Sequence, residues 1–182
     1  MNFIVYDLEC TCWSTELHEQ VHETIEIGAL KVDRYGRVID EFVSYIRPVI
    51  HPVLSDFCMQ LTHISQIDIN RARRFDDVME DFTDWINLDN TQEEYALCSW
   101  GGFDKRQLVA DCKLHQLDAQ WVESHINIKE QYKQLRKLRQ PIGLKKAVER
   151  EGFEFTGVAH RAFTDAENLA KIVAKYLDLW WL

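Results

Sequence analysis

Residues 2–9 have the sequence Asn2-Phe3-Ile4-Val5-Tyr6-Asp7-Leu8-Glu9, and this stretch decides the fold. Its apolar, β-favouring start predicts a buried strand over residues 2–7. Two acids end that strand. Asp7 and Glu9 are two residues apart, so their side chains point to the same face. Like charges placed this closely repel one another unless a positive group lies between them. The pair is therefore either two solvated acids at a strand end or part of a cation site.

The pattern outward from this strand predicts a mixed sheet covered by helices. Apolar residues alternate over 23–33, and a turn at 35–37 leads into a strand over 37–47, which completes an antiparallel meander. Further elements are expected at 75–87 (helix), 95–100 (strand), 104–114 (helix), 125–129 (strand), 143–151 (helix) and from Thr164 (helix). This order indicates an α/β fold, an antiparallel meander plus parallel strands with helices on both faces. The length suits a single domain, 1–182.

The overall charge excludes a protein that coats nucleic acid by bulk attraction. Asp and Glu number 30 against 21 Lys and Arg, a net charge of −9. Residues 129–150 depart from this balance, with a run of basic residues: Lys129, Lys133, Arg136, Lys137, Arg139, Lys145, Lys146 and Arg150. The run is either a solvated helix face or a flank that contacts phosphates.

The cysteines and the hydropathy pattern indicate a cytoplasmic protein. Five cysteines form neither a CxxC pair nor a zinc-type spacing with histidine, so reduced thiols are expected. The start of the chain lacks the pattern of a signal peptide, and no apolar run approaches the roughly 18 residues of a membrane span. We therefore expect no membrane association.

Three more polar residues stand at the ends of predicted elements. Asp104 follows the strand 95–100 and opens a helix, Asp165 lies at the start of the last helix beside an expected Thr164–Glu167 capping box, and His160 lies in the loop before it. Each alone is ordinary, since acids are favourable at helix N-termini and loop histidines are usually solvated. Together with the pair on the first strand they converge at one edge of an α/β sheet.

That convergence predicts a metal site. Four carboxylates without partners would repel one another, whereas four carboxylates around two divalent cations are stable, because hard cations prefer oxygen ligands. Two such cations about 3.5–4 Å apart suit in-line attack at phosphorus. A histidine, with a pKa near 6.5, is suited to deprotonate the attacking water.

At three places the sequence resembles the DEDDh 3′–5′ exonucleases, a DnaQ-like family of ribonuclease H-like fold. The similar motifs are Asp7-Leu8-Glu9-Cys10-Thr11-Cys12-Trp13, Ser99-Trp100-Gly101-Gly102-Phe103-Asp104 and His160-Arg161-Ala162-Phe163-Thr164-Asp165-Ala166. The segment 47–64 resembles the subgroup of histone-mRNA 3′-end exonucleases and KapD-like proteins. Cys10 stands where that subgroup has Ala. His63 stands where the pattern Leu-Thr-Gly-Ile has Gly, which affects the expected fit of the substrate.

The resemblance implies a role for each matching residue. Asp7, Glu9, Asp104 and Asp165 would bind two Mg²⁺ or Mn²⁺ ions, and His160 would be the general base. The residues implied for substrate binding are Leu8, Thr11, Trp13 and Thr62; Trp13 either stacks on a base or packs in the protein. The substrate would be the 3′ end of single-stranded nucleic acid, RNA in preference to DNA, and the product a nucleoside 5′-monophosphate. Relatives include monomers and homodimers, and the sequence names no protein partner.

Three alternatives remain at this point. A ribonuclease H-type endonuclease shares the fold and the metal chemistry. An exonuclease-like regulatory or interaction protein would keep the fold with a weak site. An unrelated metal-dependent hydrolase would act on a nucleotide-sized substrate.

Overall fold

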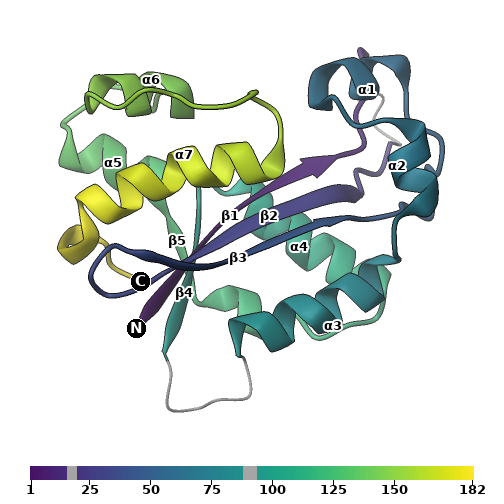
Figure 1. Cartoon of the computed structure of the whole chain (residues 1–182), viewed down its shortest axis with the longest axis horizontal. Helices are drawn as coiled ribbons and strands as arrows, with labels where there is room; N and C mark the ends of the chain where they lie inside the picture. The colour runs from purple at the N-terminus through teal and green to yellow at the C-terminus, as the bar shows by residue number, and fades with distance from the viewer. Residues whose placement is uncertain (16–19, 88–93) are drawn as a thin grey trace.

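A computed structural model gives the fold and describes residues 1–15, 20–87 and 94–182. Within these residues, five strands form one sheet in the order β3-β2-β1-β4-β5 (Figure 1). The strands are β1 (Asn2–Cys10), β2 (Thr24–Val32), β3 (Val38–Tyr45), β4 (Tyr95–Ser99) and β5 (His125–Asn127). The pairs β1–β2 and β2–β3 are antiparallel, whereas β1–β4 and β4–β5 are parallel. The predicted meander with added parallel strands is confirmed.

Helices cover both faces of this sheet, as predicted (Figure 1). The helices are α1 (Asp56–Thr62), α2 (Gln66–Arg71), α3 (Phe75–Ile86), α4 (Phe103–Leu114), α5 (Ile128–Leu135), α6 (Leu144–Arg150) and α7 (Ala162–Lys175). One apolar core lies between the sheet and α5–α7 and includes Tyr132 and Leu169. A second core lies between the opposite face and α3 and α4, and includes Phe82 and Leu108.

β1 is the central strand, and its side chains alternate between the two cores. Val5 packs in the core under α7, and its neighbour Ile4 packs in the core over α3 and α4. Since alternate residues share a face, Asp7 and Glu9 continue the Val5 row and face α7. The expected strand end at residue 7 is wrong. β1 continues to Cys10 because β2 pairs with it throughout, with Asp7 opposite Gly28 and Glu9 opposite Glu26. The two acids therefore lie within the sheet and not at a solvated strand end.

The start of α7 differs from the expected capping box at Thr164 and Glu167. The helix begins at Ala162, and no side chain of its own N-terminal segment caps it. A carboxylate from the sheet takes that place, since the Ala162 backbone N–H donates to Glu26 at 2.9 Å. The cap is distant in sequence, so a local pattern could not reveal it.

Three other elements also differ from expectation. The strand expected over 125–129 ends at Asn127, whose side chain accepts from the Glu130 backbone N–H and so caps α5. The short helices α1 and α2 were not expected. Each begins at a serine cap, Ser55 and Ser65. Among the described residues, no helix has the length and apolarity needed to cross a membrane.

Candidate active site

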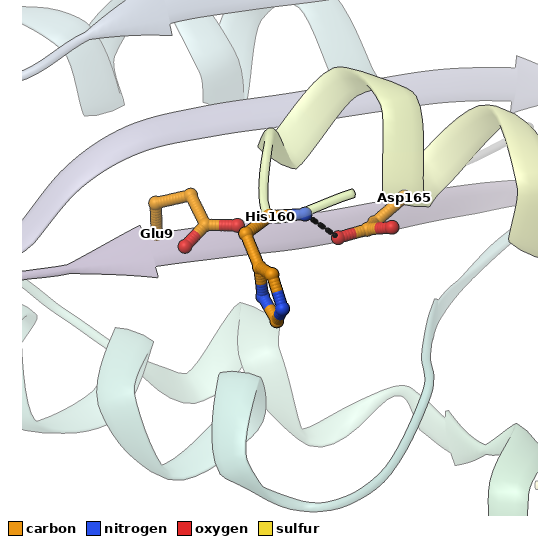
Figure 2. A group of neighbouring side chains, drawn as sticks. All are labelled: Glu9, His160 and Asp165. Atoms are coloured by element: carbon orange, nitrogen blue, oxygen red, sulfur yellow. Dashed lines mark hydrogen bonds between the residues drawn. The ribbon is translucent and has the colours of Figure 1, made fainter. Parts of the chain in front are cut away.

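Three of the predicted site residues come together where β1 meets the start of α7 (Figure 2). Glu9 comes from β1, His160 from the loop before α7, and Asp165 from the first turn of α7. One possible ligand atom from each lies within 4.8 Å of the others. The His160 backbone N–H donates to the Asp165 carboxylate at 3.0 Å, so the loop is tied to the helix that follows.

The backbone of His160 has a left-handed conformation, with φ at 62°. This region costs a residue with a Cβ roughly 1–2 kcal/mol, although histidine is among the residues found there more often. The hydrogen bond to Asp165 helps to hold this turn. The turn leaves the imidazole exposed at the edge of the site, beside the buried Glu9.

The acids of the site repel one another. Burial raises the pKa of Asp7 well above its usual value, and the charges of Asp104 and Glu9 raise it further. Burial, with repulsion from Asp165, raises the pKa of Glu9 to about 8. Burial also raises the pKa of Asp165. Burial is the largest cause of each shift, and negative charge gathered without enough positive charge adds to it.

Asp104 reaches the same cluster from the second motif. The chain leaves β4 at Ser99, turns at Gly101 with φ at 128°, and begins α4, which places Asp104 buried in its first turn. Burial raises the pKa of Asp104 to about 6. Hydrogen bonds, including one from Ser99, lower it and so oppose part of this rise. The side chain of Lys129 lies beside Gly101, so the basic segment 129–150 begins next to this turn.

This arrangement suits a divalent cation. The donors are carboxylate oxygens with one imidazole, which are ligands for Mg²⁺ and Mn²⁺. A cation would offset the repulsion that raises the pKa values of Asp7 and Glu9. The described residues therefore fit the metal site that the sequence predicts.

The sequence and the fold match known exonucleases. The sequence profile of the Exonuclease family, RNase_T, matches residues 4–173. The chain belongs to the exonuclease family. It is 32% identical over 180 residues to human "3'-5' exoribonuclease 1", covering 96% of this chain and 52% of that protein.

Solved structures agree with this assignment. The nuclease domain of 3′hExo, a DEDDh family member bound to rAMP, superposes with a TM-score of 0.91 at 31% identity, covering 97% of this chain and 92% of that chain. A 3′-exonuclease recognising the 3′ end of histone mRNA stem-loop superposes with a TM-score of 0.93 at 29% identity, covering 100% and 84%. The predicted ribonuclease H-like, DEDDh identity is confirmed, and that family depends on divalent metal ions. The chain spans 28% of human "ERI1 exoribonuclease 2" and 52% of human "3'-5' exoribonuclease 1", so it covers about half or less of these curated relatives.

The structure places the expected substrate-binding residues at different depths. Leu8 is buried in the core over α3 and α4. Thr11 is buried and accepts from the Glu23 backbone N–H at 2.9 Å. Thr62 has no exposed surface and donates to the Cys58 carbonyl. The fold thus holds the side chains of Leu8, Thr11 and Thr62, which leaves their backbone and neighbours for contact with substrate. Their binding roles stay predictions.

Trp13 is half-buried beside two histidines. Its ring centroid lies 4.9 Å from that of His51 and 5.7 Å from that of His22. Phe103, directly before Asp104, is 46% exposed and meets His22 edge to face at 6.5 Å. Phe103 lies in the second motif, but the sequence pattern assigned it no role. An exposed aromatic residue directly before a site carboxylate is a signal that could have found it.

His63 occupies a position that explains the glycine of the family pattern. It caps the C-terminus of α1 with φ at 57°, and its side chain is exposed. Helices commonly end with glycine in this left-handed conformation because glycine has no Cβ. The departure from the pattern therefore concerns the backbone at a helix end.

Proposed function

We propose that this chain is a metal-dependent 3′–5′ exonuclease that removes nucleoside 5′-monophosphates from the 3′ end of single-stranded RNA, in preference to DNA. The observation that carries the proposal is the meeting of Glu9, His160 and Asp165 beside Asp7 and Asp104. The exoribonuclease relatives support RNA as the substrate class.

Two Mg²⁺ or Mn²⁺ ions are proposed for the site. Asp7, Glu9 and Asp165 would hold one, and Asp7 with Asp104 the other. When bound, such ions make water more acidic and offset charge on the phosphate. Hydrolysis breaks the bond between phosphorus and the 3′ oxygen of the preceding nucleotide, which leaves a new 3′ hydroxyl.

His160 is proposed as the general base. Its imidazole is exposed beside the carboxyl groups of Glu9 and Asp165, so it can take a proton from water at the edge of the site. The neighbouring carboxylates would stabilise the imidazolium that forms. Phe103 and Trp13 offer aromatic surface for the terminal base, which does not require a particular sequence.

The basic segment is proposed to bind the phosphates upstream of the 3′ end. Lys129 begins this segment beside the second motif, and the cations that follow it are mostly exposed: Arg136, Lys137, Arg139, Lys145, Lys146 and Arg150. Affinity for RNA should therefore fall as salt is raised. An unchanged affinity between low and physiological salt would contradict this role.

One assay tests the proposed reaction against its alternatives. 5′-labelled RNA and DNA oligonucleotides of equal sequence are incubated with Mg²⁺, with Mn²⁺ or with EDTA. We expect a ladder that shortens from the 3′ end, faster on RNA, absent with EDTA and stalled by a blocked 3′ end. Cleavage of the blocked substrate would indicate an endonuclease, and intact substrate in every lane would indicate a regulatory protein. Cleavage confined to dinucleotides would indicate a hydrolase of small substrates.

We also propose a reducing, cytoplasmic location. The thiols of Cys10, Cys58, Cys98 and Cys112 are buried, and burial raises the pKa of the Cys112 thiol to about 12, which suits inert structural thiols. Recovery of the native protein in a membrane or secreted fraction would contradict this location.

A further inference from the structure

Glu26 is a buried acid that the reaction above does not use. It lies on β2 directly opposite Glu9, and its side chain has no exposed surface. Two like charges opposite one another in an antiparallel pair are destabilising. Arg161 supplies the opposite charge, with its Nη2 2.7 Å and its Nε 3.2 Å from the Glu26 carboxylate.

Glu26 also holds the start of α7. The Ala162 backbone N–H donates to the same carboxylate at 2.9 Å, so Glu26 caps a helix that lacks a cap of its own. The helix is pressed against the strand at Gly28, where an added Cβ would lie 2.2–2.5 Å from the backbone of Ala162 and Phe163. The glycine and the glutamate together fix where α7 begins.

Arg161 is held from a second side by Tyr45 on β3. Its Nη2 donates to the Tyr45 hydroxyl at 2.7 Å, and the guanidinium lies 5.6 Å from the tyrosine ring centroid. Arg161 directly follows His160, and its carbonyl accepts from the Asp165 backbone N–H at 2.9 Å. The Arg161 guanidinium is thus anchored in the sheet. Its backbone is joined covalently to His160 and by a hydrogen bond to Asp165.

We propose that Glu26 and Arg161 are positioning residues, which hold His160 and Asp165 at the distance from Glu9 that the metal and the attacking water require. The proposal rests on the proposed function of the site. It assigns the ion pair a role in catalysis and metal binding beyond its contribution to the fold, because outer-shell partners of metal ligands tune metal affinity and rate.

The chain contains a matched control at the other end of α7. Glu151 is also a buried glutamate in a network of cations and tyrosines, and it contacts none of the site residues. The variants Glu26→Gln and Glu151→Gln make the same chemical change. Arg161→Lys keeps the charge beside Glu26 but loses the two-pronged guanidinium contact.

The experiment compares the purified variants in three measurements. These are kcat and KM on 5′-labelled single-stranded RNA, Mn²⁺ affinity by calorimetry without RNA, and thermal unfolding in EDTA. Glu26→Gln should lower kcat by about 10–100-fold and weaken Mn²⁺ binding about tenfold, with KM for RNA unchanged. Arg161→Lys should show smaller losses of the same kind. Glu151→Gln should lower the unfolding temperature and leave kcat and Mn²⁺ affinity at wild-type values.

The opposite pattern would overturn the proposal. If Glu26→Gln matches Glu151→Gln in kcat and Mn²⁺ affinity, the ion pair is only structural, and a change in KM alone would say the same. If Glu26→Gln does not fold, Arg161→Lys decides, and wild-type values in that variant reject the proposal. Wild-type protein that binds Mn²⁺ but degrades no RNA would refute the exonuclease function, and the Mn²⁺ affinities of the variants would still test the positioning.

Discussion

Buried acids at the two ends of α7 have opposite electrostatic surroundings. At the C-terminal end, Glu151 is surrounded by donors: Arg136, Lys175, Tyr132 and Tyr176. Burial opposes its ionisation, but hydrogen bonds from Lys175 and both tyrosines outweigh burial and lower the pKa of Glu151 to about 2. At the N-terminal end the acids of the site repel one another, and burial raises the pKa of Glu9 to about 8.

The difference separates a structural network from a functional one. A fold that only needed stability would pair the acids of the site as it pairs Glu151. The unbalanced charge is retained where a cation can offset it, and the left-handed backbone of His160 lies at the same place. Glu26 stands between the two cases, because it is paired like Glu151 but lies opposite Glu9.

The largest expected effect comes from Asp7→Asn. Removing a proposed metal ligand should lower hydrolysis by about 10³-fold or more, since metal ions supply several kcal/mol of transition-state stabilisation. The metal-free protein should unfold at the same or a higher temperature, because one repelling charge is gone. Turnover of labelled RNA and thermal unfolding in EDTA measure the two effects.

An exposed acid on β3 provides the control for Asp7. Asp40→Asn makes the same charge change away from the site and should alter neither measurement. Full activity in Asp7→Asn would refute the site assignment. A large loss of stability would place Asp7 with Glu151, among the structural acids.

His160→Ala should have the next largest effect on rate. Loss of a general base lowers the rate by about 10²–10⁴-fold, and the fold should persist because the side chain is exposed. Single-turnover hydrolysis of RNA with saturating Mn²⁺ measures this loss. His115→Ala is the matched control, since that ring stacks on Phe75 at 5.0 Å. Equal rates in the two variants would remove His160 from the mechanism.

The pH dependence of stability should differ between the two ends of α7. An acid whose pKa is raised in the folded state binds more protons when folded, so its contribution falls as pH rises between the two values. For Glu9 this window runs from 4.5 to about 8. For Glu151 the folded pKa of about 2 lies below 4.5, so its contribution is complete above 4.5 and is lost as pH falls towards 2.

Thermal unfolding of the metal-free protein tests this difference. We expect the unfolding temperature to fall as pH is raised from about 5 to about 8. Saturating Mn²⁺ should flatten the fall, because a cation favours the ionised carboxylates. Glu9→Gln should make the fall shallower without metal, with the remainder contributed by Asp7 and Asp104, whereas Glu151→Gln should leave it unchanged. An unfolding temperature that does not change with pH in metal-free wild-type protein would show that the acids of the site do not repel one another.

The sequence predicted those elements and site residues that depend on local pattern. The apolar, β-favouring start of β1 and the helical spacing of α3 predicted both elements, and the acid pair on β1 was the first sign of the metal site. The predicted start of α7 was wrong because its cap, Glu26, is 136 residues from Ala162 in sequence. No periodicity or local motif reports a partner at that distance.

The backbone of single residues was also beyond sequence patterns. Both His63 and His160 are left-handed, and histidine itself does not signal this conformation. The family pattern indicated glycine in place of His63, but only the structure shows that the position ends α1. Helices α1 and α2 span only seven and six residues, too short for a clear period, although their serine caps were readable signals.

The smallest effect should come from His63→Gly, which separates backbone strain from function. The two left-handed histidines have φ values of 57° and 62°, but only His160 lies among the possible metal ligands. Glycine at position 63 should raise the free energy of unfolding by about 1 kcal/mol, or the unfolding temperature by about 2–4 °C, with kcat unchanged. Glycine at position 160 should relieve the same strain but lose the base. Thermal unfolding and RNA turnover in both variants check this, and a changed KM in His63→Gly would instead place that residue on the path of the substrate.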